Sequence, residues 1–177
     1  MRNNSQRWRR ELIEKLYELR TEGSKKGKDY KNTENKYKHK DVKAALTGMY
    51  QSLCCYCETK ISFVSARHIE HRKPKSGFPN STFLWSNLHL CCPDCNLAKR
   101  DKYNYEAPIL DAATDEIGPD VFDYDHEGEG VWLVPKNARA ETTENHANLN
   151  REELRLKIRQ EILLSALNLA RIIHGAP

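Results

Sequence analysis

Between two clusters of cysteines lies a run of residues whose types suit the hydrolysis of a phosphodiester. Glu70 and His71 are adjacent, Asn87 follows after a loop with proline and glycine, and Asn96 comes directly after the last cysteine. Phosphodiester hydrolysis needs an activated water, charge neutralisation at the phosphoryl oxygens and help for the leaving oxygen. A histidine, a divalent cation and the cation's oxygen ligands can together meet all three needs.

The six cysteines favour a metal site. They fall into two clusters, Cys54-Cys55-Tyr56-Cys57 and Cys91-Cys92-Pro93-Asp94-Cys95. Within these clusters are two C-x-x-C pairs, Cys54 with Cys57 and Cys92 with Cys95. Four thiolates at this spacing can surround a tetrahedral Zn²⁺ ion and leave no position open for water, so we expect a structural site that stabilises the segment between the pairs. Buried free thiols are the alternative, and Cys55 and Cys91 are expected to be filler.

A strand, a bend, a second strand and a helix would position these residues. The first strand is predicted at Phe63-Val64 and Ile69, ending at Glu70-His71. Neighbours on a strand point to opposite sides, so this pair can act together only if the chain bends at their junction, as Pro74 favours. Pro93 suits the first turn of a helix running to about Lys102, which would place Asn96 near the beginning of that helix.

Helices and a hairpin are predicted on either side. Residues 5–21 have apolar residues at helical spacing, and residues 22–40 read as a basic loop or arm. Asp41 can cap a helix to about Gln51, with Val42, Ala45, Leu46 and Met49 facing inward. A hairpin is predicted from Val121–Tyr124 and Val131–Val134. Asn150 can cap a long helix over 151–173 that buries Leu154, Ile158, Ile162, Leu163, Leu167 and Leu169 or Ala170.

The region between the cysteine pairs resembles the HNH, or ββα-metal, nuclease family in its zinc-bearing form. The family pattern has a C-x-x-C, an acidic residue followed by histidine and a nearby proline, a central Asn-Leu, and C-x-x-C-Asn-x-x-Lys. This sequence supplies these elements in order as Cys54/Cys57, Glu70-His71 with Pro74, Asn87-Leu88, and Cys92/Cys95-Asn96 with Lys99. The resemblance implies an α+β fold with a ββα-metal core and a four-cysteine zinc knuckle, flanked by the terminal helices and the hairpin.

The resemblance also implies roles for individual residues. His71 would be the general base that activates water, and Asn87 would brace the loop and orient the histidine. Glu70 and Asn96 would hold the catalytic divalent ion, for which Mg²⁺ or Mn²⁺ suits the oxygen ligands. The family often has Asp at the position of Glu70 and His at the position of Asn96, so the metal geometry can differ here.

Basic residues near the motif are expected to neutralise backbone phosphates; solvated surface charge is the alternative. These residues are Arg72, Lys73, Lys75, Lys99 and Arg100. His68 has no role that the family pattern supplies, and it is expected to be a supporting contact or an exposed strand residue. His89 alternates with Leu88 and Leu90, so it is expected to face away from the core.

The flanks, from KDVKAALTGMYQSLCCYC through HIEHRKPKS to ANLNREELRLKIRQ, resemble small HNH proteins of the retron and Septu antiphage defence systems. This resemblance implies a nuclease subunit that works with an ABC-type ATPase and cleaves DNA, or else RNA such as tRNA. The long C-terminal helix and the acidic segment 106–129 would serve as docking surfaces. A stand-alone restriction or homing endonuclease and a non-catalytic zinc module that binds nucleic acid or protein are the alternatives.

Overall composition sets fewer constraints. The net charge of +4 is too small to indicate nucleic-acid binding by itself. The N-terminus lacks the apolar core of a secretory signal and no apolar run reaches membrane-spanning length, so we expect a cytoplasmic protein with cysteines that bind metal rather than form disulfides. We expect N-terminal helices and a basic loop over 1–51, a nuclease core over 52–104, and the acidic loop, hairpin and C-terminal helix over 105–177, packed as one compact unit.

Overall fold

The computed structural model describes residues 10–15, 17–18, 28–61, 66–126 and 130–174. The chain divides into two compact units, Met1–Tyr103 and Asn104–Pro177, where the sequence predicted one. The boundary between the units falls within one residue of the expected end of the nuclease core. Among the described residues, no helix is both long enough and apolar enough to span a membrane.

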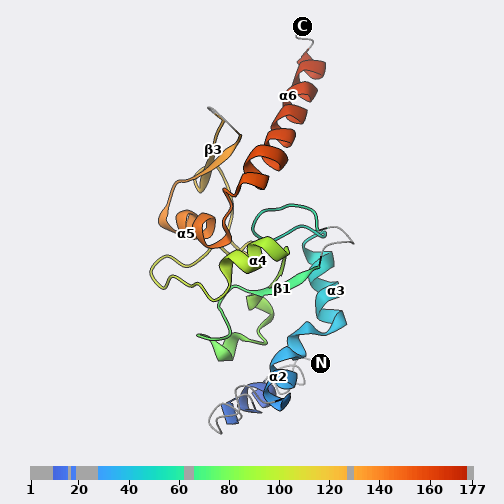
Figure 1. The fold of residues 1–177 in the computed structure, drawn as a ribbon, viewed down its shortest axis with the longest axis vertical. Coiled ribbons are helices and arrows are strands. Elements are labelled where there is room, and N and C mark those ends of the chain that lie inside the picture. Colours follow the sequence, from blue (N-terminus) through green and yellow to red (C-terminus); the bar gives the residue numbers. More distant parts are fainter. Residues whose placement is uncertain (1–9, 16, 19–27, 62–65, 127–129, 175–177) are drawn as a thin grey trace. The chain divides into compact units, whose positions relative to one another are not determined.

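The first unit is built on two short strands and a helix. β1 (His68–His71) pairs antiparallel with β2 (Leu88–Cys91), so that His68 lies opposite Cys91 and Glu70 opposite His89. The connection contains two short 3₁₀ helices, η2 (Pro79–Ser81) and η3 (Trp85–Asn87). α4 (Pro93–Lys99) follows β2 and packs against β1 (Figure 1). This strand–loop–strand–helix order confirms the predicted α+β core.

Two details of the core differ from the sequence prediction. α4 ends at Lys99 rather than at about Lys102, because Arg100 has φ 46° and ψ −127°, a backbone conformation that cannot continue a helix. The predicted strand residues Phe63 and Val64 lie outside the described residues, and β1 begins at His68.

The segment before the core is more helical than its sequence suggests. Residues 10–15 and 17–18 are helical, and the rest of the predicted helix over 5–21 lies outside the described residues. Within the expected basic loop, α2 (Lys28–Glu34) and η1 (Asn35–Lys38) form instead. Thr33 and Tyr37 are buried there. Tertiary packing of these two residues therefore compensates for the missing apolar periodicity.

The predicted helix over 41–51 is present as α3 (Lys40–Met49), with a different cap and a smaller buried face. The His39 imidazole, and not the Asp41 side chain, accepts the hydrogen bond that caps the helix. Leu46 is fully buried, whereas Met49 is exposed and Ala45 is also on the surface. Val42 is half-buried, so Leu46 is the one fully buried residue of the predicted inward face of α3.

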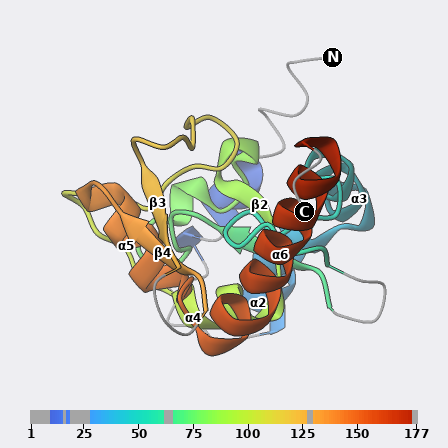
Figure 2. The ribbon, with the colours of Figure 1, turned by 90° about the horizontal axis from the view of Figure 1, so that it is seen from above.

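The second unit contains the predicted hairpin and a helix that the sequence analysis missed. β3 (Phe122–Asp125) pairs antiparallel with β4 (Trp132–Pro135), which confirms the hairpin. α5 (Ala138–Ala147) follows and packs against β4 (Figure 2). Its buried residues are small, Ala140, Thr142, Thr143 and Ala147, so it lacks the large apolar stripe by which a helix is predicted. Asn137 caps it by accepting a hydrogen bond from the Ala140 backbone N–H.

The C-terminal segment begins as a π-helix, η4 (Glu153–Arg159), and continues as α6 (Gln160–His174). Asn150 does not cap it: its side-chain amide pairs with both backbone groups of Leu133 on β4. Of the residues predicted to be buried, Leu154 is buried, Ile158 and Leu163 are half-buried, and the Ala170 side chain lies outside the description. Ile162, Leu167 and Leu169 are exposed. The helical periodicity was therefore read correctly, but most of the apolar face of α6 is not covered.

Candidate nuclease site

Four thiols gather at one end of the core. The Sγ atoms of Cys54, Cys57, Cys92 and Cys95 all lie within 4.8 Å of one another, and all but Cys57 are buried. The six cysteines form no disulfide. Four soft ligands at this spacing fit a tetrahedral Zn²⁺ ion. The Sγ atoms of Cys54, Cys55 and Cys91 form a second group that also lies within 4.8 Å, and this group has one ligand fewer.

The local backbone explains why the first pair can converge. Ser52 and Glu58 adopt left-handed conformations on either side of the pair, and Leu53 bridges to Lys60, which folds the segment into a tight knuckle. The Cys55 backbone N–H donates to the Leu90 carbonyl of β2 at 2.8 Å and fixes the knuckle to the sheet. Burial raises the pKa of the Cys55 thiol, whereas hydrogen bonds from Cys55 and other neighbours lower the pKa of Cys54. Cys54 is thus the better thiolate ligand of the two.

His71 ends β1 in a defined tautomer. Its Nε2 lies 2.9 Å from the Thr82 carbonyl oxygen, which can only accept, so Nε2 holds the proton and Nδ1 is the free base. The side chain is buried. Burial lowers the pKa of His71 to about 4, and the positive charges of Lys75 and Lys99 also lower it. At neutral pH the imidazole is therefore neutral and can accept a proton.

Asn87 holds the loop that contains Thr82. Its Oδ1 accepts from the Lys73 backbone N–H at 2.7 Å, and its Nδ2 donates to the carbonyls of Lys73 and Ser81, each at 3.0 Å. The side chain is buried, and its hydrogen bonds tie the two ends of the loop between β1 and β2 together. Asn87 thus acts on His71 through the backbone position of Thr82 rather than by direct contact.

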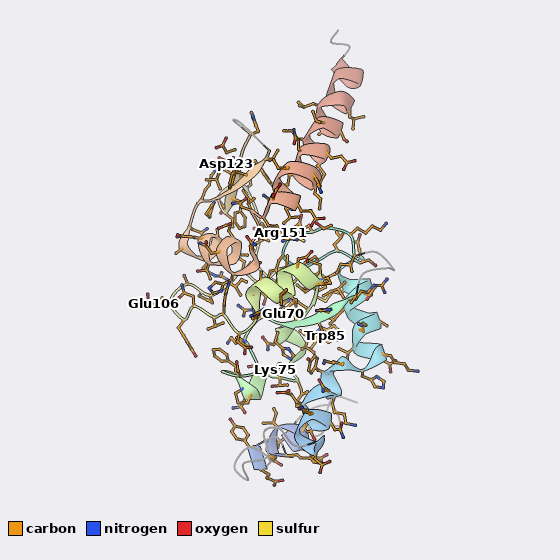
Figure 3. The ribbon with its side chains drawn as sticks, in the orientation of Figure 1. Glu70, Lys75, Trp85, Glu106, Asp123 and Arg151 are labelled. Carbon is orange, nitrogen blue, oxygen red and sulfur yellow. The ribbon has the colours of Figure 1, made fainter. Side chains whose placement is uncertain are left out.

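Glu70 is buried beside Lys99, a residue that the sequence analysis expected to contact phosphate. The Lys99 ammonium lies 2.6 Å from Glu70 Oε1 and donates to the His71 carbonyl at 2.9 Å. Lys99 is fully buried, so the prediction that it contacts phosphate is not met in this structure. Burial raises the pKa of Glu70 and Lys99 opposes that rise. Figure 3 shows Glu70 between β1 and α4.

A cavity of about 600 Å³ brings the predicted site residues together. Glu70, His71 and Asn96 all line it, together with His68. Asn96 is on α4, one residue after Cys95, and its Nδ2 lies 2.9 Å from His68 Nδ1. A buried carboxylate has acceptor capacity beyond the oxygen that faces Lys99, and the amide oxygen is a second hard donor. The donor set therefore fits a divalent ion such as Mg²⁺ or Mn²⁺.

The rest of the cavity wall contains five basic residues, one acidic residue (Asp101) and several apolar or aromatic residues. Of the residues predicted to contact phosphate, Lys75 and Arg100 line the cavity, while Arg72 and Lys73 are half-buried and are not part of its lining. The structure adds three basic residues to the wall, Lys38, Lys43 and Arg67. Lys38 belongs to the basic loop predicted over residues 22–40, but nothing in the sequence indicated that this segment lies next to His71.

Tyr37 is a site residue that the sequence analysis missed. Its ring packs edge-on against the His71 imidazole, with the ring centroids 4.5 Å apart, and it is buried. The Lys75 ammonium lies 5.0 Å from the centre of the Tyr37 ring and 3.3 Å from Glu34. Tyr37 lies in a basic stretch without periodicity, so no sequence signal linked it to the base.

His89 also differs from its prediction. It was expected to face away from the core, yet it is buried and its Nδ1 pairs with the Tyr50 hydroxyl of the segment after α3. β2 is buried along its whole length, so the alternation of Leu and His does not mark an exposed face.

The geometry agrees with the comparisons to known proteins. Residues 54–102 match the family model of the HNH endonucleases. This part of the chain is an HNH endonuclease domain, a domain of phosphodiester hydrolases, which confirms the resemblance. The Septu protein PtuB of Bacillus thuringiensis is 28% identical over 110 residues, covering 62% of this chain and 41% of that protein. PtuB of Bacillus mycoides (strain KBAB4) is 33% identical over 89 residues, covering 43% of this chain and 30% of that protein.

The chain thus spans less than half the length of the curated relatives it matches. No solved structure matches it.

The four-thiolate site predicts that two equally buried cysteines differ in their effect. Cys95→Ala should remove bound zinc and lower the midpoint of thermal unfolding, because a structural zinc contributes folding free energy. Cys91→Ala makes the same chemical change at a site of equal burial and should retain the zinc. Zinc per chain by elemental analysis, with circular dichroism during heating, measures both effects. Loss of zinc from Cys91→Ala with retention in Cys95→Ala would show that the group of Cys54, Cys55 and Cys91 binds the metal instead.

The buried ion pair predicts a large cost for removing its cation. Lys99→Met should destabilise the first unit by about 3–5 kcal/mol, because it leaves the Glu70 carboxylate buried without a partner. Lys102→Met, at an exposed position on the same segment, should change stability by less than about 0.5 kcal/mol. Urea unfolding in the presence of zinc measures both values. Equal effects of the two substitutions would mean that the pair does not hold α4 on β1.

Proposed function

We propose that this chain is a metal-dependent HNH endonuclease that hydrolyses nucleic-acid phosphodiesters, and that it is the nuclease subunit of an antiphage defence complex with an ABC-type ATPase. The observation that best supports the catalytic part is the single cavity lined by His71, Glu70 and Asn96 within an HNH domain. A nucleic-acid substrate and six reduced cysteines both suit the cytoplasm, where we place the protein.

His71 is proposed as the general base. Its Nε2 is held by the Thr82 carbonyl, so Nδ1 is the nitrogen that takes a proton from water. Asn87 fixes the loop and hence the direction of the ring. Because the low pKa of His71 keeps its imidazole neutral at neutral pH, the imidazole need not lose a proton before it can act as a base.

Glu70 and Asn96 would hold the divalent ion. When bound there, the ion would neutralise charge on the phosphoryl group and assist departure of the leaving oxygen. Lys99 orients the Glu70 carboxylate through Oε1, and Asn96 is set in place by the adjacent zinc ligand Cys95. The rigid support of both residues favours a fixed separation between base and ion.

The basic wall would bind the nucleic-acid backbone. Lys75, Arg100, Lys38, Lys43 and Arg67 surround the cavity and can neutralise phosphates on both sides of the scissile bond. Arg72 and Lys73 are proposed to extend this contact beyond the cavity. Such contacts recognise phosphates rather than bases, so we propose cleavage with little sequence preference. We propose DNA as the substrate in preference to RNA, and phosphate contacts alone do not separate the two.

The defence assignment rests on the similarity to the Septu protein PtuB. We propose that α6 contacts the ATPase partner, because Ile162, Leu164, Leu167 and Leu169 are exposed on it. Exposed apolar residues that gather on one surface often mark protein–protein interfaces. The acidic segment 106–129 is a further candidate contact. A stand-alone restriction or homing endonuclease is the second candidate, since the catalytic domain would be the same.

The catalytic proposal predicts the effect of a single substitution. Purified wild-type protein should nick supercoiled plasmid with Mg²⁺ or Mn²⁺ and stop on addition of EDTA. His71→Ala should lower the rate about 10²–10⁴-fold, because it removes the general base, while zinc content and circular dichroism stay the same. His126→Ala, at an exposed position on the second unit, is the matched control and should cleave as wild type does.

Cleavage by His71→Ala at the wild-type rate would contradict the assignment of the base. Absence of cleavage by wild type, on plasmid and on RNA, with and without the ATPase partner, would instead support a non-catalytic zinc module.

The partner proposal predicts that an exposed helix residue matters only in the complex. Ile162→Glu should leave zinc content and thermal unfolding of the purified chain unchanged, because Ile162 is exposed. In cells that contain the ATPase, the same variant should lose association with it and lower protection against phage at least tenfold in plaque counts. The matched control is Glu161→Lys on the neighbouring, polar side of α6. Full protection by Ile162→Glu would favour a nuclease that works without a partner on this helix.

A further inference from the structure

His68 has a position that the family pattern does not account for. It lies two residues before Glu70 on β1, so the two side chains leave the strand on the same face. Their cross-strand partners, Cys91 and His89, are likewise two residues apart on β2. Both His68 and Glu70 line the cavity that Asn96 also enters. Three groups capable of binding a metal therefore converge from β1 and α4.

The contact between His68 and Asn96 has the spacing of two ligands of one ion. Asn96 Nδ2 lies 2.9 Å from His68 Nδ1. Two neighbouring ligands of an octahedral ion, each about 2.1 Å from it, are separated by about 3 Å. Rotation of the amide by half a turn places Oδ1, a metal donor, where Nδ2 now lies. A cation can thus replace the amide–imidazole hydrogen bond with little movement of either side chain.

We infer that His68 is a third protein ligand of the divalent ion, beside Glu70 and Asn96. The inference rests on the proposed function and specifies its metal site. One carboxylate, one amide oxygen and one imidazole nitrogen make a mixed donor set. Imidazole binds Mn²⁺ and later transition metals better than it binds Mg²⁺, so this ligand gives the site a preference for Mn²⁺. His71 stays outside the set because its Nε2 is bonded to Thr82 and its Nδ1 is needed for water.

A loss of metal affinity alone would not establish the ligand. Residues that only orient a ligand also weaken metal binding, by about 10–100-fold when they are replaced. If His68 only positioned Asn96, no nitrogen would be bound to the ion and the preference for Mn²⁺ over Mg²⁺ would not change. The direct bond and the selectivity are therefore the readouts that separate a ligand from a positioning residue.

The experiment titrates Mn²⁺ into the untagged, zinc-loaded protein and follows binding by electron paramagnetic resonance. Competition with Mg²⁺ gives the ratio of the two affinities. Pulsed measurements on the Mn²⁺-loaded protein detect coupling to a directly bound ¹⁴N nucleus. The proteins are wild type, His68→Ala, His71→Ala, and His126→Ala as the control that removes an exposed histidine of the second unit.

We expect ¹⁴N coupling in wild type, His71→Ala and His126→Ala and its loss in His68→Ala. The Mn²⁺ affinity of His68→Ala should fall at least tenfold, with a smaller fall for Mg²⁺. Unchanged ¹⁴N coupling in His68→Ala, or an equal fall for both metals, would overturn the inference while leaving the metal-dependent nuclease intact. Failure of wild type to bind Mn²⁺ at all would overturn both the inference and the proposed function.

Discussion

A fully buried ammonium group joins the two elements that form the site. Lys99 reaches from the last turn of α4 to the Glu70 carboxylate and the His71 carbonyl on β1. A buried charge is tolerated only where it is paired, so any shift of α4 along β1 would leave two groups without partners. Cys95 and Asn96 are on the same short helix. One interaction thus sets the distance between the strand that carries His71, the proposed base, and the helix that carries Asn96, a proposed metal ligand.

The small size of the elements explains why a metal would be needed as well. β1 and β2 have four residues each and α4 has seven, lengths at which an isolated hairpin or helix is not stable in water. Much of what the core buries is cysteine, and the four clustered thiols lie where the knuckle meets the start of α4. A zinc ion there would replace apolar contacts that the chain is too short to supply.

The order of the core could be predicted from the sequence, because the motif is a set of local spacings. The same reasoning failed where a contact depends on tertiary packing. Lys99 was expected to contact phosphate, whereas it is fully buried because it pairs with Glu70, which is distant in sequence. Tyr37 and Thr82 reach His71 from segments without periodicity. α5 was missed because alanine and threonine, rather than large apolar residues, form its buried side.

The position of the two cysteine pairs along the chain has a consequence for protein synthesis. The first pair leaves the ribosome before His71 and Asn87, and these residues precede the second pair. Until Cys92 and Cys95 emerge, a metal at this site would have only half of its proposed ligands, and Asn96 has not yet been made. A nascent or truncated chain that ends before this point would therefore contain the proposed base without the rest of the proposed centre. On the proposed function, the catalytic arrangement would become available only after the whole domain has been synthesised.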